Sequence, residues 1–503
     1  MKHFIFLTVF LSVYFTLFSQ LDSTSRYAFS EIHGEVLDAD TKLPLAFTNI
    51  GILSVNRGTV SNENGQYLLD ISDIDILDTV SFHYIGYKAY KVSIADLLND
   101  SLVLLQENII SISDFIVYGN EIDAKAIVEK IIPHKDKNYK PVPLKSRMFI
   151  RDRYATTVMK LKVKSLKNSF DQLDANTASM IERSVPKEQL SYTDFYGDVY
   201  SNNDNGIDKE KRTKMSAIKI ISLKDNQDYS EIEKVFNNLF SNTKDDEYWK
   251  VASGLFSTKA EITGDSAKAD TAYNVDDYKN TMSSWFFAKQ INRSNEFLSM
   301  NSDENWEFLY KTAKYNYTMF GGTRIKGEDV YIIDFVAKRR GDYAGRLYVS
   351  CSTYAILKAE FGYAQGKSGT DISILGVSYK ETVHKVTVFY ENHGGTYHLK
   401  YLFRQEGELI GINRKVELLK KRERFLFDKT LAKYKVKLNY NAKNLNSIEI
   451  LVINEEDISP KQFANFKSKE RFKVKYVNKF DDSMWKGFSI IAPTDQMKDY
   501  RKR

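Results

Sequence analysis

The stretch from residue 32 to residue 94 consists of short apolar segments separated by turn residues. Apolar and polar positions alternate on either side of a turn that contains Asp38 and Pro44. A period of two residues is typical of half-buried strands. Asn64-Gly65 supplies the positive φ values of a tight hairpin, and strand-like residues flank it. Short strands spaced by turns predict an antiparallel β-sandwich.

A further strand pair, residues 78–84 and 87–94, brackets Ile85-Gly86. The residues that share a known pattern are Gly34, Val36, Asp38, Thr41, Pro44, Leu45, Asn49, Ile50, Gly58, Thr59, Asn64, Gly65, Tyr67, Phe82, Tyr84, Gly86 and Tyr87. On these residues, 29–118 resembles the carboxypeptidase regulatory-like domain, a prealbumin-like β-sandwich common on exported proteins of Bacteroidetes. The resemblance implies a binding or scaffolding module that does no chemistry itself.

The N-terminus resembles an export signal. A short basic start precedes an apolar run at residues 4–18, and the small residue Ser19 follows. This order predicts a signal peptide over residues 1–20, cleaved near Ser19 or Gln20. The alternative, an uncleaved membrane anchor, needs ~20 apolar residues. No Cys follows the run, so we expect no lipid-modified N-terminus. The predicted location is periplasmic or outer-membrane-associated.

The apolar period changes after the sandwich. Residues 120–132 have apolar positions at helical spacing, with Asn120 as an N-cap and Pro133 as a stop, which predicts a helical linker over 119–145. Strand-like alternation resumes in a domain expected to span 146–503. A helical insertion is expected at about 170–280, and its clearest segment is 230–240.

The last third of the chain reads as consecutive strands. They are expected at 306–314, 315–320, 329–337, 345–351, 355–363, 385–390, 397–403 and 434–438, with turns at 321–322, 341–342 and 392–395. Such a meander predicts a curved antiparallel sheet or half-barrel. The pattern over 330–358 resembles the curved sheet of LolA-type lipoprotein carriers. The predicted fold class is mainly β with helical insertions: a sandwich, a helical linker and this sheet.

Composition and charge narrow the function classes. With 503 residues, 43% of them hydrophobic, the chain can bury a sizeable core in two or three domains. The net charge of +6 is too small to indicate nucleic-acid binding. Basic residues concentrate at 414–415 and 420–424. Such a cluster either contacts anionic lipid head groups or forms a solvated face.

No motif predicts a catalytic, cofactor-binding or metal-ligating residue. The six histidines of the mature chain lack the spacing of metal ligands; they are His33, His83, His134, His384, His393 and His398. Cys351, the only cysteine, forms no intramolecular disulfide and is expected to be a buried small hydrophobe. Residues 362–368 imitate a phosphate loop with one residue too few, and 201–212 imitates a calcium loop without its carboxylates.

These observations favour a non-enzymatic, exported envelope protein. The sandwich would bind or scaffold, and the larger domain would hold a lipid or other apolar ligand in the concavity of its sheet, unless its aromatic residues simply fill a core. A protein, glycan or lipid partner, and peripheral contact with the outer membrane, fit this hypothesis. One alternative is a hydrolase whose site is assembled from distant residues, with a histidine and carboxylates converging in a cleft. Another is a relative of TonB-dependent receptors.

Overall fold

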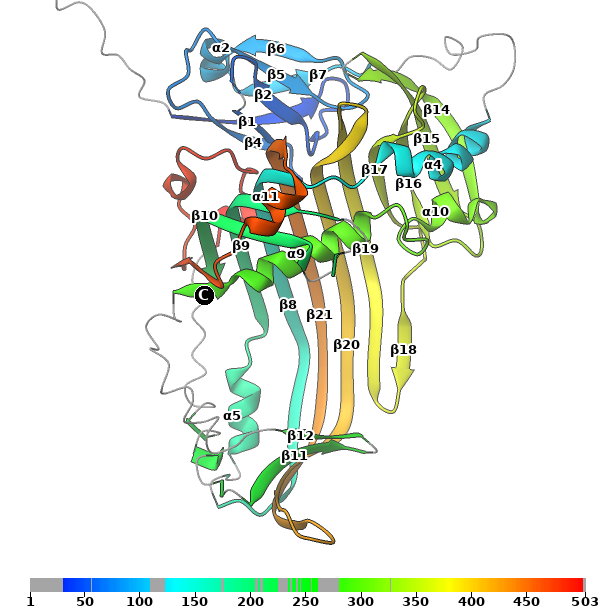
Figure 1. Cartoon of the computed structure of the whole chain (residues 1–503). Coiled ribbons are helices and arrows are strands. Elements are labelled where there is room, and N and C mark those ends of the chain that lie inside the picture. Colours follow the sequence, from blue (N-terminus) through cyan, green and yellow to red (C-terminus); the bar gives the residue numbers. More distant parts are fainter. Residues whose placement is uncertain are drawn as a thin grey trace, which may run out of the picture.

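The computed structural model describes residues 30–108 and 123–500, apart from 56, 172, 174–175, 204–206, 209–210, 225–233, 236–237, 241–242, 245, 255, 261–279 and 326. The expected signal peptide, the segment 109–118 and Asn120 lie outside the described residues. The described chain is mainly β, with a small sandwich at one end of a very long sheet (Figure 1). The predicted fold class is confirmed.

The sandwich consists of two small sheets around one core. One sheet has the order β4 (Gln66–Asp70), β1 (Glu31–Asp38), β7 (Leu102–Leu105), and the other β3 (Arg57–Val60), β2 (Asn49–Ile52), β5 (Thr79–His83), β6 (Tyr90–Ser93). Helix α2 (Ile94–Asn99) follows, and the hydroxyl of Ser93 accepts from the amide of Asp96 at its N-terminus. Alternate residues of β1 are buried, as the period of two predicts. Both sheets contribute to the core: Ile32, Val36, Ile50, Leu69, Val80, Phe82 and Val103.

Side-chain hydrogen bonds explain the turns of the sandwich. The predicted turn after Asp38 is confirmed: this carboxylate accepts from the amides of Asp40 and Thr41 and from the Tyr87 hydroxyl. The Tyr87 hydroxyl and the Thr41 amide lower the pKa of Asp38 to about 2. The predicted turn at Gly86, whose φ is 93°, also joins two antiparallel strands, β5 and β6.

The predicted hairpin at Asn64-Gly65 is wrong. Gly65 has the expected positive φ of 75°, but β3 and β4 on either side belong to different sheets. The Asn62 side chain accepts from the amides of Asn64 and Gln66, and this bends the chain from one sheet into the other. A turn signal therefore located the turn but not the pairing of its strands.

All the remaining described strands except β13 (Thr281–Ser283) and β22 (Arg471–Lys473) form one large sheet. Its order is β14 (Tyr315–Ile325), β15 (Glu328–Ala337), β16 (Tyr343–Ser350), β17 (Ile356–Tyr363), β19 (Val377–His393), β20 (Thr396–Arg422), β21 (Lys429–Asp457), β8 (Leu144–Asn168), β9 (Glu188–Ser201), β10 (Thr213–Lys224) and β23 (Lys475–Val477). β18 (Asp371–Ile374) pairs with β19; β11 (Glu247–Ser253) pairs with β20 and with β12 (Phe256–Ala260). All pairs are antiparallel except β10 with β23. The predicted curved antiparallel sheet is confirmed.

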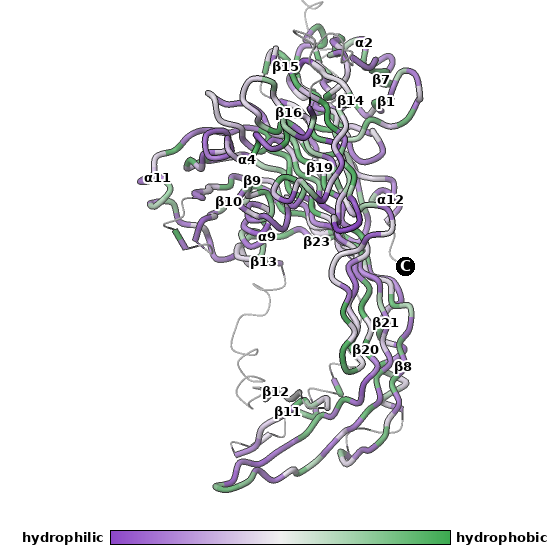
Figure 2. Tube along the Cα trace, turned by 90° about the vertical axis from the view of Figure 1, so that its right-hand side faces the viewer, coloured by the Kyte–Doolittle hydropathy of each residue, from purple (hydrophilic) through white to green (hydrophobic). Residues whose placement is uncertain are grey.

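Three strands are far longer than the rest and give the molecule its shape. β8, β20 and β21 have 25, 27 and 29 residues, and at ~3.3 Å per residue the last spans about 95 Å. Their central parts belong to a broad head. Their far ends, residues 157–168, 409–422 and 429–443, project from it as an arm that curves to one side and carries β11 and β12 (Figures 1 and 2).

Both faces of the sheet are covered in the head. We call the face beneath α4 (Ala124–Asn138), α9 (Ser284–Leu298) and α10 (Glu307–Tyr310) the inner face. The outer face packs on the sandwich and on residues 485–492, which include the end of η3 (Asp482–Trp485). On the outer face the ring of Phe47 lies 4.8 Å from that of Tyr401 and 5.4 Å from that of Phe403. The sandwich is thus built onto the large sheet.

The short elements complete the head and its edges. They are α5 (Thr177–Ser184), β13 (Thr281–Ser283), which pairs with β22 (Arg471–Lys473), η2 (Thr312–Lys314), α11 (Pro460–Asn465) and α12 (Asp495–Lys498). Helix α11 begins with a capping box between Ser459 and Gln462.

The linker helix differs from its prediction at both ends. Asp123 caps α4 by accepting from the amide of Lys125, and the helix continues through Pro133 to Asn138. A proline inside a helix removes one hydrogen bond. Here Ile127, Val128 and Ile131 are buried in the inner-face core, and this packing outweighs the missing bond.

The predicted helical insertion at about 170–280 is largely wrong. Its described residues include α5 but also β9, β10, β11 and β12. The described part of the predicted helix at 230–240, residues 234–235 and 238–240, is helical. β9 and β10 were missed because several consecutive residues are buried on both faces, for example Ile220 and Ile221, which removes the alternation that marks a strand.

Two smaller predictions for the last third are also wrong. Residues 306–314 contain α10 and η2. This segment is helical because Trp306, Phe308 and Leu309 are all buried and pack against the inner face of the sheet. The ring of Phe308 stacks on that of Phe335, with 4.2 Å between the ring centres. Gly321-Gly322 is no turn but part of β14, at a register shift that follows Met319.

Candidate functional site

A cavity of about 1230 Å³ lies on the inner face of the head, where α9 crosses the sheet. We call it the inner cavity. Its walls come from α9 and the segment after it, from the end of α4, and from β8, β19, β20 and β21. Ligand pockets commonly measure ~300–1,000 Å³, so this cavity has room for a large ligand. The lining residues used below are Tyr139, Met148, Arg293, Phe297, Met300, Glu381, His384, Tyr390, His398, Leu399, Arg404 and Glu455.

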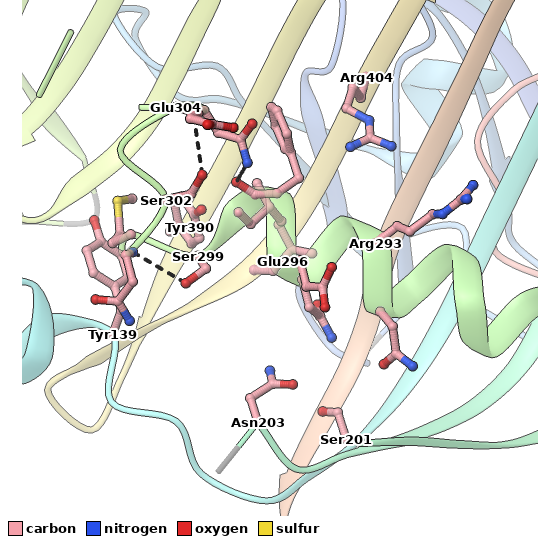
Figure 3. A pocket seen from close by; sticks show the side chains of 18 of the residues that line it. Tyr139, Ser201, Asn203, Arg293, Glu296, Ser299, Ser302, Glu304, Tyr390 and Arg404 are labelled. Carbon is pink, nitrogen blue, oxygen red and sulfur yellow. Dashed lines mark hydrogen bonds between the residues drawn. The ribbon is translucent and has the colours of Figure 1, made fainter. Parts of the chain in front are cut away.

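Helix α9 places side chains of two kinds beside the inner cavity. The hydroxyl of Ser283 accepts from the amide of Trp285 and caps the helix. Its buried residues recur at helical spacing and anchor it: Phe287, Ile291, Ser294, Phe297 and Leu298. Arg293 and Glu296 lie on the opposite, exposed side of the helix, towards the cavity (Figure 3).

Two arginines meet at one end of the cavity. Arg404 of β20 is only 14% exposed, and its guanidinium lies 4.8 Å from the ring centre of Phe297. Its one ion pair within the described part of the chain is a 3.6 Å contact with Glu406, and its guanidinium makes no hydrogen bond to a described residue. Burial and the nearby charge of Arg293 lower the pKa of Arg404. Arg404 and Arg293 therefore place two guanidinium groups in a cavity wall that also carries Glu296 and Glu406 (Figure 3).

Two further polar groups in the wall of the cavity lack partners among the described residues. His384 Nε2 and the Tyr390 hydroxyl are buried without a hydrogen bond to any described residue. Burial and the charge of Arg404 lower the pKa of His384 to about 4, so the imidazole is neutral at neutral pH. The His384 ring lies among Phe297, Tyr343 and Tyr363 at 5.4–5.7 Å. An unsatisfied buried polar group costs ~1–3 kcal/mol, which a bound ligand would recover.

A second wall of the cavity carries carboxylates that already have partners. Glu381 accepts from the hydroxyls of Tyr363 and Tyr379 and from the Thr370 amide. The Asn444 side chain donates to Glu408 at 3.4 Å. These acids are held in place by the protein itself, whereas Arg404 and His384 are not.

A histidine and a carboxylate do converge in this cavity. His398 Nδ1 lies 3.0 Å from Glu455, and its Nε2 lies 3.0 Å from the hydroxyl of Thr396. With Nδ1–H donating to the carboxylate, Nε2 is free to accept from the hydroxyl, which is the order found in hydrolytic triads. The Thr396 hydroxyl also lies 3.0 Å from the His393 carbonyl, a competing acceptor.

Of the other sequence candidates, Ser201, Asn203 and Arg212 of the calcium-like segment line the inner cavity, whereas Cys351 and Gly366 do not. Cys351 is half-buried after β16, and burial raises the pKa of its thiol to about 11, which suppresses the thiolate. Gly366 forms a turn after β17 with a φ of 76°. Part of 201–212, including Asn205 and Gly206, is outside the described residues. Among the residues that are described, no group of three or more His, Cys, Asp and Glu side chains is arranged to hold a metal ion. In the same part of the chain, no helix is long and apolar enough to cross a membrane.

The sequence did not single out Arg293 or Arg404. They come from α9 and β20, more than a hundred residues apart, and only the crossing of the helix over the sheet brings them together. The one available signal was an arginine directly after the buried residues Leu402 and Phe403, where a charge faces the same side as a core residue.

Comparison with known proteins identifies one part of the chain. The family model of the CarboxypepD_reg-like domain matches residues 32–117, which are well under half of the chain. The resemblance expected for the sandwich is therefore confirmed. No curated protein matches the chain.

Several solved structures show a distant similarity. The Pseudomonas aeruginosa MucA/MucB complex is 6% identical, with 65% of this chain and 93% of that chain covered and a TM-score of 0.18. A LolA superfamily protein from Nitrosomonas europaea is 12% identical, with 68% and 97% of the two chains covered and a TM-score of 0.15. A DUF1329 family protein from Desulfovibrio piger is 11% identical, with 68% and 98% covered and a TM-score of 0.19. The LolA superfamily is thus among the similar structures, as the resemblance of the last third suggested. With TM-scores this low, the similarity carries no argument about function.

Proposed function

We propose that this is a non-catalytic, exported envelope protein that holds an amphipathic anion, such as a fatty acid or an anionic lipid, in its inner cavity. The observation that carries the proposal is Arg404, a largely buried guanidinium that faces the cavity without a hydrogen bond to any described residue. A guanidinium has five donors in a planar fork that suits carboxylate and phosphate. A bound anion would accept hydrogen bonds from these donors.

The rest of the lining fits an acyl chain. Phe297 and Met300 from α9 and the segment after it line the cavity together with Met148, Tyr390 and Leu399 from the sheet. Aromatic and methionine side chains adapt to flexible apolar ligands. The head group would lie at Arg293 and Arg404, and the chain would extend along these residues.

The ligand proposed here differs from the purely apolar one that the sequence suggested. Most aromatic residues of the inner face fill a solid core, for example Phe308, Phe335 and Phe361, so the sheet does not enclose a continuous apolar channel. The space that remains has charged as well as apolar walls. An amphipathic ligand matches both.

Mass spectrometry of molecules extracted from the purified mature chain tests this function. We expect an anionic amphiphile to co-purify with the natural protein and to be depleted in an Arg404→Gln variant. Arg324→Gln is the matched control, because Arg324 is 60% exposed and pairs with Asp329 far from the cavity. Equal recovery from all three proteins, or recovery of no amphiphile, would contradict the proposal.

The contacts of His398 favour a second candidate, a hydrolase with Thr396 as its nucleophile. The hydroxyl oxygen would attack an acyl carbonyl and pass its proton to His398, with Glu455 holding the imidazole; water would then release the acyl group. Hydrolysis of a p-nitrophenyl ester that is lost in both Thr396→Val and His398→Gln, but kept in His393→Gln, would support it. Absence of turnover, or turnover that survives in Thr396→Val, would remove it.

A further inference from the structure

The hairpin between β20 and β21 ends in three exposed apolar side chains. Phe425 is fully exposed, and Leu426 and Phe427 are 78% and 86% exposed. The last pair of the ladder is Arg422 with Lys429, so the three residues lie within the loop of residues 423–428. We call residues 422–429 the tip; it is the end of the arm farthest from the head (Figure 1).

The tip projects beyond the strands that could cover it. β8 ends at Asn168, opposite Tyr434 of β21, and Ser169 still exchanges hydrogen bonds with Lys433; beyond this point no described strand pairs with β21 on that side. The ladder of β11 with β20 ends at Arg422; beyond it, the Glu423 amide donates to the Asp246 carbonyl and the Tyr248 hydroxyl donates to Asp428, and neither bond covers the apolar side chains. A small core behind the tip, built around Trp249, Phe170 and Tyr434, stiffens the arm without reaching the loop. An apolar loop held out on a stiff arm is typical of a contact surface.

Basic residues surround the apolar loop. Residues 420–437 contain eight Lys or Arg and two acids, which gives this short segment a net charge of +6, equal to that of the whole chain. Some of these cations are paired: Lys420 with Glu247, and Lys433 with Glu417. Four others make no ion pair within the described residues: Lys421, Arg424, Lys429 and Lys437.

We propose that the tip docks on the surface of an anionic phospholipid bilayer. Phe425, Leu426 and Phe427 would enter the boundary between head groups and acyl chains, while the unpaired cations at the tip, Lys421, Arg424 and Lys429, would contact lipid phosphates. Charge complementarity selects this occupant, because a second copy of the chain would present the same positive tip and repel it. The chain runs 17 residues from Glu408 at the inner cavity to Phe425, so at ~3.3 Å per residue the cavity would stand about 55 Å from the membrane.

This proposal is independent of the cavity ligand. It rests on the tip and its charges alone, and it specifies a surface that the inner cavity does not touch. The basic cluster at 420–424 lies at the tip. The sequence alone allowed either lipid contact or a solvated face for this cluster, and the proposal assigns it to lipid contact.

Flotation of the mature chain with lipid vesicles tests the proposal. The full-length mature protein is mixed with phosphatidylcholine vesicles, with or without phosphatidylglycerol, and the floated fraction is measured. We expect binding to the anionic vesicles that weakens with salt, and a loss of about tenfold or more in Phe425→Ser, Leu426→Ser, Phe427→Ser combined. Lys421→Gln with Lys429→Gln should reduce anionic binding while leaving the apolar loop intact.

A matched control changes three equally apolar exposed residues elsewhere. Ile372, Ile374 and Leu375, on the β18–β19 hairpin, are 46%, 60% and 59% exposed. Their combined change to serine should leave flotation unaltered. Three results would overturn the proposal. They are flotation of the tip variant, equal flotation of the protein with neutral and anionic vesicles, and loss of flotation in the control variant as well. A change of oligomeric state in the tip variant without vesicles would instead identify a self-association surface and would also overturn it.

Discussion

The head and the arm share β8, β20 and β21, yet the two halves of these strands differ in how their apolar residues are spaced. In the head, Tyr401, Leu402 and Phe403 are buried in succession. In the arm, Lys433, Lys435 and Lys437 alternate with Tyr434 and Val436. Strands covered on both faces become continuously apolar, whereas strands covered on one face alternate. The same strands therefore belong to a packed core in the head and to the projecting arm beyond it.

The head and the arm therefore differ in the interactions that stabilise them. The head contains the inner-face and outer-face cores, which join the sheet to its helices and to the sandwich. The arm contains one small core, and backbone pairing supplies the rest of its order. We expect substitutions in the head to change stability strongly and those in the arm to change it little.

The largest expected effect is at Arg151, in the head. Its guanidinium donates two hydrogen bonds to Asp194, at 2.9 and 2.8 Å, and both side chains are almost fully buried. Arg151→Met leaves the Asp194 carboxylate uncompensated and should cost ~3–5 kcal/mol of unfolding free energy. The matched control is Arg147→Met on the same strand, because its pair with Asp198 is more exposed and should cost at most ~1 kcal/mol. Denaturant titration measures both; equal losses would contradict the burial argument.

A leucine pair on one strand compares the two halves directly. Leu402 is fully buried in the head, and Leu418 is half-buried beside the small core of the arm. Leu402→Ala should cost ~2–5 kcal/mol of unfolding free energy, and Leu418→Ala about 1 kcal/mol. Thermal and chemical unfolding would show the ranking. A larger loss at Leu418 would mean that the arm, not the head, limits stability.

Glu449 should make the head less stable as the pH rises. Burial raises the pKa of its carboxyl from 4.5 to about 7, although Arg151 acts in the opposite direction. Between these values the unfolded chain loses the proton and the folded chain keeps it, so unfolding free energy falls by roughly 3 kcal/mol across this window. Glu449→Gln still accepts from Tyr401 but should lack this decline.

The lowered pKa of His384 acts in the opposite direction, because stability is lost as the pH falls from 6.5 towards 4. This pH dependence is the same in the natural protein and in the Glu449→Gln variant, so it cancels when their unfolding free energies are subtracted. If the pH profiles of unfolding free energy are parallel in the natural protein and in the Glu449→Gln variant, the decline does not come from Glu449.

The smallest expected effect on stability is at the tip. Changing Phe425, Leu426 and Phe427 to serine removes side chains that contact little, so the unfolding free energy should change by less than ~0.5 kcal/mol. A circular dichroism melt checks this. A loss comparable to that of Leu402→Ala would show that the tip packs against the rest of the arm in solution.

Local signals in the sequence identified the sandwich and the small strands. Asp38 and Gly86 act within a few residues of themselves, so their turns are readable without the fold. β20 and β21 were found only in fragments, because strands of 27 and 29 residues exceed the usual ~3–10. The apolar triplet at the tip, between basic residues, was a readable signal that went unused.

The candidate site could not be read in this way. Arg293, His384 and Arg404 come from α9, β19 and β20, and His398 meets Glu455 across 57 positions. Such contacts depend on register and on where a helix crosses a sheet, and neither leaves a local pattern in the sequence.

The anion site in the inner cavity can be measured by titration of the purified, delipidated mature chain with a fluorescent fatty acid. We expect saturable binding that weakens about tenfold or more in Arg404→Gln, since one hydrogen bond to a charged group is worth ~1.5–3 kcal/mol. We expect unchanged binding in Arg324→Gln and in the triple tip variant. Non-saturable binding, or equal affinity in the Arg404→Gln variant, would show that the inner cavity does not hold an amphipathic anion.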